Sequence, residues 1–184
     1  YCMVLTSYAS KRFKSSTQTL NTKVQAIVNP EEKGEFLMRY GTISLQKGDP
    51  VLATKNSHSL SIFNGMTGVI ESIEADSGKV NCHVKFDDDF GISILSQEDC
   101  YEIGLQLAYL ITIHKSQGSE YDNCAILMDS PFLERSGIYT ALTRTKKLCV
   151  LIGTNEQYNN AIRRAPSYES IRSGFAPVFE KTLN

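Results

Sequence analysis

The sequence predicts an α/β domain that is interrupted by a small all-β insertion. Three observations support this fold class: apolar runs typical of strands buried on both faces, amphipathic stretches between those runs, and a middle segment of short strands separated by turn residues. The chain has 184 residues, of which 41% are hydrophobic, so it is long enough to bury a substantial core. This length corresponds to one domain, or to one domain that carries a small insertion.

Four short apolar runs predict the strands of a parallel sheet. They are CMVL (2–5), LAYLITI (107–113), CAILM (124–128) and LCVLIG (148–153). Their apolar residues are continuous rather than alternating, which is typical of strands that are covered on both faces. Strands of this kind belong to parallel sheets, because crossover helices lie on both sides of such sheets.

Three amphipathic stretches predict helices in the outer parts of the chain. Residues 16–29 carry one apolar stripe, and residues 134–146 carry another. The first stripe contains Leu20, Val24, Ile27 and Val28, and the second contains Ile138, Ala141, Leu142 and Thr145. Residues 154–165 begin with Thr154, a good N-cap, and predict the third helix.

Residues 42–103 have a different pattern, with short strand-like runs between turn residues. Asn-Gly at 64–65 and Ser-Gly at 77–78 are typical of tight turns between antiparallel strands. The segment therefore predicts a small antiparallel barrel. The surrounding α/β domain would then be discontinuous and consist of residues 1–41 and 104–184.

Composition limits the class of protein without identifying a partner. The 19 basic and 20 acidic residues nearly cancel, so any binding of nucleic acid must depend on a local patch. The five cysteines are odd in number and widely spaced, which favours a reducing compartment. No apolar run approaches the roughly 18 residues that span a bilayer, and no charged leader precedes a cleavable segment. We therefore expect a soluble, cytoplasmic protein without a membrane partner, and the start at Tyr1 indicates a fragment of a longer chain.

A polar cluster, HKSQGSE (114–120), directly follows the predicted strand 107–113. Ligands of parallel sheets bind outside the carboxyl ends of the strands, where loops lead into helix N-termini that favour anions. Gly118 would let the backbone approach a ligand closely, and Ser116 and Ser119 could donate to a phosphate.

The other polar residues of this cluster have two interpretations. His114 and Lys115 could donate to a phosphodiester, while Gln117 and Glu120 could contact a nucleotide. Alternatively, Ser116 only caps a helix, Glu120 favours the helix dipole, and the remaining residues are solvated. The cluster alone favours neither interpretation.

A second candidate is Arg144 in IYTALTRTKK (138–147). At the edge of the apolar stripe of the predicted helix, its guanidinium could reach a phosphate at the strand ends. The alternative is that Arg144, Lys146 and Lys147 lie in the last turn of the helix, where cations interact favourably with its dipole. Without further context the alternative is the stronger one.

Several other sites are excluded by spacing. Cys82, His83, Cys100 and His114 lack paired metal-ligand spacing, so we expect no zinc site. The acidic residues 87–89 fit a solvated hairpin tip better than a cation site. No G-x-S-x-G segment occurs, and nothing matches G-x-x-x-x-G-K-[ST], so this chain contains no P-loop.

In combination, four segments resemble the C-terminal motor region of superfamily 1 DNA helicases of the RecD/TraA type. The segments are LNTKVQAIVNP (20–30), KGDPVLATKN with FNGMTGVI (47–56 and 63–70), LAYLITIHKSQGSEYD (107–122) and IYTALTRTKKLCVLIG (138–153). They are distributed over most of the length of the chain. They resemble, in order, the helix after helicase motif IV, the start of an inserted SH3-like barrel, motif V, and motif VI with its following strand. The implied fold is the second RecA-like domain, residues 1–41 and 104–184, with an SH3-like barrel at 42–103.

The resemblance implies ATP, with Mg²⁺, and single-stranded DNA as ligands. The N-terminal P-loop domain of the same protein would complete the ATP site and supply the metal ligands. Arg144 would be the catalytic arginine finger, and the ATP-binding residues would be Gln117, Gly118, Glu120 and Arg144. The residues near the DNA backbone would be Thr112, His114, Lys115 and Ser116.

The resemblance also implies that the barrel lies over the DNA channel. Candidate contacts are Lys55, Asn56, Phe63 and Asn64, although Lys55 and Asn56 could form a solvated turn. Phe63 fits the barrel core better than a DNA contact. Motif IV departs from the family pattern, because residues 5–17 contain neither its proline nor its basic-glycine pair. Lys11 or Arg12 could supply a phosphate contact there.

The predicted function is part of an ATP-dependent DNA helicase, and the fragment alone is expected to be inactive because it has no P-loop. The alternative is a non-catalytic nucleic-acid-binding or protein-docking module whose motor loops are vestigial. Translocation polarity, the choice between DNA and RNA, and a role in repair, recombination or conjugation all stay open.

Overall fold

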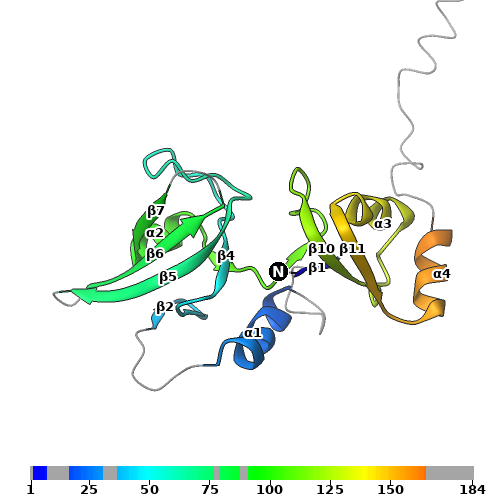
Figure 1. Cartoon of the computed structure of the whole chain (residues 1–184), viewed down its shortest axis with the longest axis horizontal. Helices are drawn as coiled ribbons and strands as arrows, with labels where there is room; N and C mark the ends of the chain where they lie inside the picture. Colours follow the sequence, from blue (N-terminus) through cyan, green and yellow to red (C-terminus); the bar gives the residue numbers. More distant parts are fainter. Residues whose placement is uncertain (1, 8–16, 31–36, 77–78, 88–90, 165–184) are drawn as a thin grey trace, which may run out of the picture.

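The computed structural model describes residues 2–7, 17–30, 37–76, 79–87 and 91–164. Figure 1 shows a β-barrel on the left and a parallel sheet with helices on the right, with α1 (Thr17–Val28) below their junction. The predicted fold class is confirmed: an α/β unit with a parallel sheet is interrupted by a small antiparallel β-barrel. In the described residues, no helix is long and apolar enough to cross a membrane.

The parallel sheet has the strand order β11-β10-β1-β9. Its strands are β1 (Cys2–Thr6), β9 (Leu110–Thr112), β10 (Tyr121–Leu127) and β11 (Thr145–Ile152). Two helices, α3 (Arg135–Leu142) and α4 (Asn155–Arg163), share its apolar core. The predicted N-cap of α4 is confirmed, because Thr154 Oγ1 accepts a hydrogen bond of 3.2 Å from the backbone N–H of Gln157.

The barrel contains a five-stranded antiparallel sheet of order β7-β6-β5-β4-β8. Its strands are β4 (Pro50–Leu52), β5 (Thr67–Asp76), β6 (Lys79–Phe86), β7 (Ile92–Ser96) and β8 (Gln106–Leu107). A hairpin of β2 (Met38–Tyr40) and β3 (Ile43–Leu45) and a short helix, α2 (Gln97–Glu102), complete it. Met38 and Leu105 are fully buried in the barrel core, although they lie outside residues 42–103, and the predicted domain limits stay a prediction.

The apolar run 107–113 forms two strands rather than the predicted single strand. Leu107 ends β8, which pairs antiparallel with β4 in the barrel, whereas Leu110 begins β9, which pairs parallel with β1. Apolar periodicity cannot show that a run changes from one sheet to another, because both halves are buried. As a consequence, β9 and the loop after it are attached directly to the barrel.

The prediction that all four apolar runs are covered on both faces is wrong for β11. The exposed fractions of Leu148, Val150 and Ile152 are 58%, 44% and 48%. These residues share one face of β11, which is the edge strand of the sheet. A continuous apolar pattern predicts a strand but does not show whether the strand is central or at an edge.

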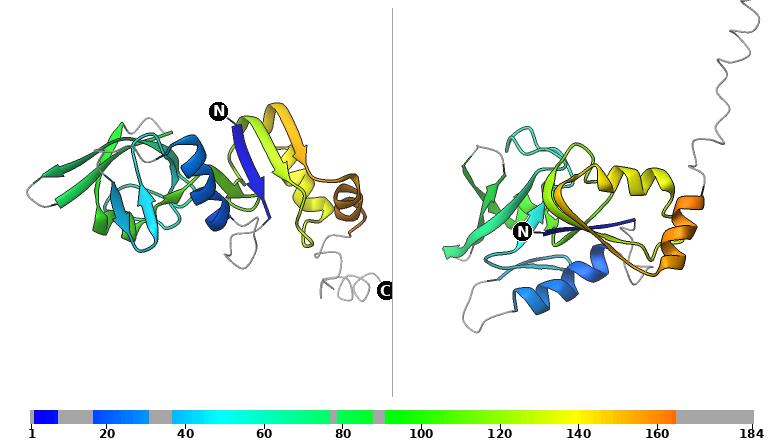
Figure 2. Two further views of the ribbon diagram at one scale, coloured as in Figure 1. Left: turned by 90° about the horizontal axis from the view of Figure 1, so that it is seen from below. Right: turned by 45° about the vertical axis from the view of Figure 1, so that its right-hand side comes forward.

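The predicted apolar stripe of α1 does not face a core. Ile27 and Val28 are 80% and 66% exposed, and the buried residues of the helix are Asn21 and Gln25. The reason is that α1 lies against hydrogen-bonding groups of β9 and of the barrel rather than against an apolar surface. The left view of Figure 2 shows the helix between these two parts of the molecule.

The predicted helix 134–146 is shorter than its sequence pattern. α3 ends at Leu142, and Thr145, which the pattern places on the helical stripe, begins β11. Arg144 therefore lies in the connection between a helix and a strand. The alternative in which Arg144, Lys146 and Lys147 form the last helical turn is wrong, because both lysines belong to β11.

Candidate functional site

The loop at residues 113–120 connects β9 to β10 by a series of turns. No helix follows this loop, so the predicted helix N-terminus and the capping role of Ser116 are both wrong. The chain instead crosses β1, which lies between β9 and β10 in the sheet. Gly118 has a φ of +87°, a conformation that favours glycine, and it is exposed at the surface of the loop.

Ser116 supports the loop from inside. Its side chain is fully buried, and its hydroxyl donates a hydrogen bond of 2.7 Å to the carbonyl of Ile113. Its backbone N–H also donates to the carbonyl of Thr112, at 3.1 Å. A side chain in this position holds the turn rather than meeting a ligand.

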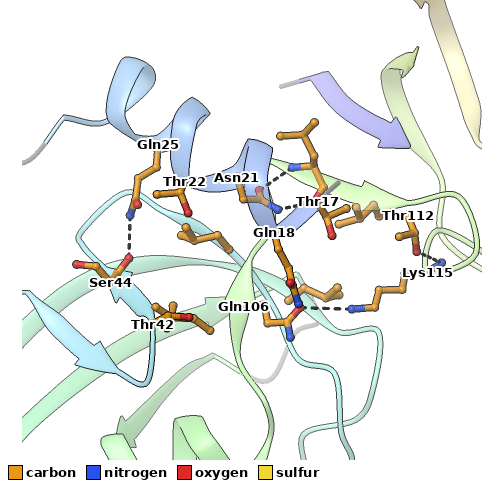
Figure 3. A pocket seen from close by; sticks show the side chains of 15 residues that line it. Thr17, Gln18, Asn21, Thr22, Gln25, Thr42, Ser44, Gln106, Thr112 and Lys115 are labelled. Carbon is orange, nitrogen blue, oxygen red and sulfur yellow. Dashed lines mark hydrogen bonds between the residues drawn. The ribbon is translucent and has the colours of Figure 1, made fainter. Parts of the chain in front are cut away.

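One side of the loop borders a cavity of about 420 Å³ (Figure 3). The cavity lies between α1, the β2–β3 hairpin, β8, β9 and Lys115 in the loop after β9. Its polar side chains belong to Thr17, Gln18, Asn21, Thr22, Gln25, Thr42, Ser44, Gln106, Thr112 and Lys115. A volume of this size is within the usual range for a small-molecule site.

Lys115 supplies the positive charge of this cavity. Among the described residues that line the cavity, it is the one charged side chain. Its Nζ lies 3.5 Å from Oε1 of Gln106, and burial lowers the pKa of the ammonium group. The lining thus combines hydroxyl and amide groups, some aliphatic surface, and one partly desolvated cation.

The opposite side of the loop meets Arg144. The guanidinium donates through Nη1 to the carbonyl of Ser119 at 3.3 Å, and through Nε to the carbonyl of Thr140 at 3.2 Å. Nη2 donates to the hydroxyl of Thr143 at 3.1 Å. In the described part of the chain, these hydrogen bonds are all to neutral oxygens, so the charge of Arg144 is available to an anion.

Glu120 also lies near Arg144, close to the start of β11. Its Oε2 is 3.2 Å from Nζ of Lys146, and the backbone N–H of Tyr121 donates to the carbonyl of Arg144 at 2.8 Å. These contacts bring Ser119 and Glu120 together with the connection that carries Arg144. The loop therefore separates two surfaces, one around Lys115 and the other around Arg144.

The remaining predicted residues of the loop are less constrained. His114 and Gln117 are exposed on the outside of the turns, while the hydroxyl of Thr112 accepts a hydrogen bond of 3.2 Å from the backbone N–H of Lys115. Lys11, Arg12 and most of the acidic tip 87–89 lie outside the described residues.

The predicted barrel residues gather on one surface loop between β4 and β5. Asn56 Oδ1 accepts a hydrogen bond of 2.7 Å from the backbone N–H of Asn64, and Nζ of Lys55 lies 5.5 Å from the ring centroid of Tyr101. Phe63 is 44% exposed and packs edge-on against His58, so its predicted place in the barrel core is wrong. None of these residues lines the cavity, and α1 lies at the opposite end of the barrel (Figure 1).

Several cavity residues were not predicted from the sequence. Thr17, Gln18 and Thr22 project from α1, whereas Ser44 and Gln106 come from two barrel strands. These segments are far apart in the sequence, and hydroxyl and amide residues on a helix surface are ordinary. The available signal was the spacing of four residues that separates Asn21, Gln25 and Asn29, which predicts a second, polar stripe on the helix.

Both parts of the chain, the barrel and the parallel-sheet unit, are similar to parts of known proteins. Residues 20–86 match the SH3 domain of ATP-dependent RecD-like DNA helicases, and residues 107–152 match the UvrD-like helicase C-terminal domain. The chain is 31% identical over 148 residues to the ATP-dependent RecD2 DNA helicase of Deinococcus radiodurans. It is also 31% identical over 166 residues to the RecBCD enzyme subunit RecD of Mycolicibacterium smegmatis.

Solved structures show the same fold. Pif1 of Bacteroides bound to ssDNA superposes with a TM-score of 0.61 at 19% identity, covering all of this chain and 46% of that protein. Pif1 of Candida albicans superposes with a TM-score of 0.54 at 15% identity, covering 98% of this chain and 50% of that protein. The matches to the two sequence relatives include 79% and 85% of this chain but only 19% and 26% of the relatives' lengths.

Proposed function

Because the chain belongs to the RecD-like family of superfamily 1 helicase domains, we propose that it supplies motifs V and VI to an ATP-dependent DNA helicase. Residues 1–41 and 104–184 would form the second RecA-like domain, and residues 42–103 the inserted barrel. The observation that carries this proposal is the position of the loop 113–120, which borders a cavity through Lys115 and meets the guanidinium of Arg144 through Ser119. A translocating motor needs such an element, because ATP hydrolysis must change its hold on the nucleic acid.

The first part of the proposal is that ATP binds beside Arg144. Its guanidinium acts as an arginine finger toward the γ-phosphate of ATP, with Gln117, Gly118 and Glu120 beside the nucleotide. The exposed backbone of Gly118 permits close approach of the ligand. A P-loop domain elsewhere in the complete protein supplies the opposite wall of the site and holds the Mg²⁺ that accompanies ATP.

The second part of the proposal is that single-stranded DNA binds in the cavity. Thr112 and Lys115 meet the sugar-phosphate backbone of single-stranded DNA, and exposed His114 lies next to them. The lining is neutral apart from Lys115, which suits one phosphate with its sugar and base better than a cluster of phosphates. Ser116 contributes by shaping the loop.

The barrel loop provides a further proposed contact with the same strand. Lys55 carries the charge, Asn56 and Asn64 can donate hydrogen bonds, and the exposed ring of Phe63 offers a surface on which a base can stack. Because this loop is outside the cavity, the two contacts would hold different nucleotides.

We expect the isolated 184-residue chain to show no ATP hydrolysis above background, with or without oligo(dT). The physical reason is that it contains no G-x-x-x-x-G-K-[ST] segment to hold the phosphates opposite Arg144. A phosphate-release assay on the purified chain, with the chain carrying Arg144→Ala as control, measures this. Hydrolysis that Arg144→Ala abolishes would show that the chain has a complete site and would overturn the proposal of a shared one.

In the complete protein, Lys115→Ala is expected to weaken binding of oligo(dT) about tenfold, because one phosphate contact and its counterion release are lost. The dependence of log affinity on log salt concentration should become less steep by about 0.7 for a single strand. Fluorescence anisotropy at several salt concentrations measures both quantities. Lys23→Ala is the matched control, since Lys23 is exposed on α1 and is not among the cavity residues. An unchanged affinity and slope for Lys115→Ala would remove the cavity from the DNA path.

A further inference from the structure

The buried side of α1 is made of amides rather than apolar side chains. Asn21 and Gln25 in α1 and Asn29 directly after it are spaced by four residues, so they point to the same side. Asn21 forms two hydrogen bonds with the free edge of β9. Its Nδ2 donates to the carbonyl of Leu110 and its Oδ1 accepts from the N–H of Leu110, both at 2.9 Å. Helix α1 is therefore fixed to the strand that leads into the loop 113–120.

The other two amides are fixed to the barrel through the carboxylate of Asp49. Asp49 is fully buried in the turn before β4. Its Oδ2 accepts from Nε2 of Gln25 at 2.6 Å and from the backbone N–H of Gln46 at 2.9 Å. Its Oδ1 accepts from Nδ2 of Asn29 at 2.8 Å.

Tyr109 supplies the fourth donor. Its hydroxyl donates to Oδ1 of Asp49 at 2.8 Å, and the residue directly precedes β9. Burial raises the pKa of the Asp49 carboxyl, whereas the four hydrogen bonds oppose this effect. A buried carboxylate surrounded by donors from three segments is a costly group to place in a protein, and it specifies one arrangement of those segments.

These contacts form a closed ring around one end of the cavity. The ring runs from α1 through Asp49 to Tyr109, continues to Leu110, and returns through Asn21 to α1. Asn21, Gln25 and Leu110 also line the cavity, so the ring and the cavity share walls. A change in the ring is therefore expected to change the separation between α1 and β9, the strand that ends at Thr112 and leads into the loop with Lys115.

We propose that Asp49 is a positioning residue that sets the width of the DNA-binding cavity by joining α1, the barrel and the segment before β9. This inference rests on the proposed function, since it assigns the residue that holds the cavity in its binding shape. Asp49 and Tyr109 do not touch the DNA; they act through Asn21, Gln25 and β9.

The test is the oligo(dT) dependence of ATP hydrolysis by the complete protein. Tyr109→Phe removes one hydrogen bond and leaves the rest of the ring, so it should raise the oligo(dT) concentration for half-maximal ATP hydrolysis about threefold. Asp49→Ala removes the shared acceptor and should raise it about tenfold or more. In both variants the maximal rate at saturating oligo(dT) should stay within about twofold of the wild type. Tyr158→Phe, in α4, is the matched control and should leave all values unchanged.

A purely structural role would give a different result. It would lower the melting temperature of Tyr109→Phe without moving the oligo(dT) half-saturation measured well below that temperature, and this outcome would overturn the inference. A reduced maximal rate with unchanged half-saturation would overturn it as well. If Asp49→Ala does not fold, Tyr109→Phe alone decides. Absence of any oligo(dT) binding or stimulation in the wild type would instead reject the proposed function, and the inference with it.

Discussion

In the complete protein, Arg144→Ala is expected to lower the rate of oligo(dT)-stimulated ATP hydrolysis about a thousandfold or more while leaving the affinity for ATP nearly unchanged. An arginine finger stabilises charge that develops on the γ-phosphate during hydrolysis, so its loss affects the transition state more than the bound substrate. The geometry supports this role, because the guanidinium is held beside the loop 113–120 by carbonyl and hydroxyl oxygens.

The measurements are the steady-state rate at saturating oligo(dT) and the dissociation constant of a fluorescent, non-hydrolysable ATP analogue. Arg144→Lys keeps the charge but loses the planar fork, so it should recover only part of the rate. Lys147→Ala is the matched control, because Lys147 is a nearby cation on β11 that pairs with exposed Asp122 at 2.9 Å. Normal turnover in Arg144→Ala would refute the finger assignment, and an equal loss of binding and rate would make Arg144 a binding residue.

Sequence patterns predicted the order of the secondary structure better than its packing. The N-cap of α4, the Asn64-Gly65 turn and the antiparallel barrel could be predicted because each depends on local chemistry. The packing of α1 and β11 could not be predicted in this way. The apolar residues of α1 are exposed because its neighbours in space offer hydrogen-bonding groups, and no periodicity within the helix records what those neighbours are.

The end of α3 shows the same limit at the position of Arg144, the proposed finger residue. The pattern of Ile138, Ala141, Leu142 and Thr145 fits one helical stripe, but the chain leaves the helix after Leu142 to pair Thr145 with Tyr121 of β10. Pairing between strands distant in the sequence overrides the helical preference of the last residues. As a result, Arg144 meets Ser119 from a connecting segment rather than from a helix surface.

The sequence could predict only the part of the candidate site that a single segment, the loop 113–120, contributes. The loop 113–120 stands out because polar residues follow a buried strand, yet the burial of Ser116 depends on the turn that the loop adopts. The cavity is built from three segments that meet only in the fold, so Thr17, Ser44 and Gln106 have no common signal in the sequence. Likewise, nothing local to Asp49 indicates that Tyr109 will donate to it.

The second large effect is expected in the barrel, where Gly68→Ala should lower the free energy of unfolding by about 3 kcal/mol. A Cβ at this position would lie 2.6 Å from the carbonyl oxygen of Lys85 and 2.9 Å from the Cα of Phe86. Both atoms belong to the backbone of β6, which pairs with β5 and cannot move without loss of the ladder. Urea denaturation of the 184-residue chain, followed by far-UV circular dichroism, measures the change.

Gly137→Ala is the matched control for Gly68→Ala, because its new Cβ meets only Cδ1 of Leu133, at 3.1 Å. That atom is the end of a side chain rather than backbone, and alanine is favoured over glycine within a helix by about 1 kcal/mol, so stability should change much less than in Gly68→Ala. Equal stability of Gly68→Ala and wild type would mean that β5 and β6 can separate at that point without cost.

Gly68→Ala also distinguishes the contribution of the barrel to DNA binding from the contribution of Arg144 and the loop 113–120 to ATP hydrolysis. In the complete protein, a barrel loosened by Gly68→Ala should weaken oligo(dT) binding while basal ATP hydrolysis continues, since Arg144 and the loop 113–120 lie outside the barrel sheet.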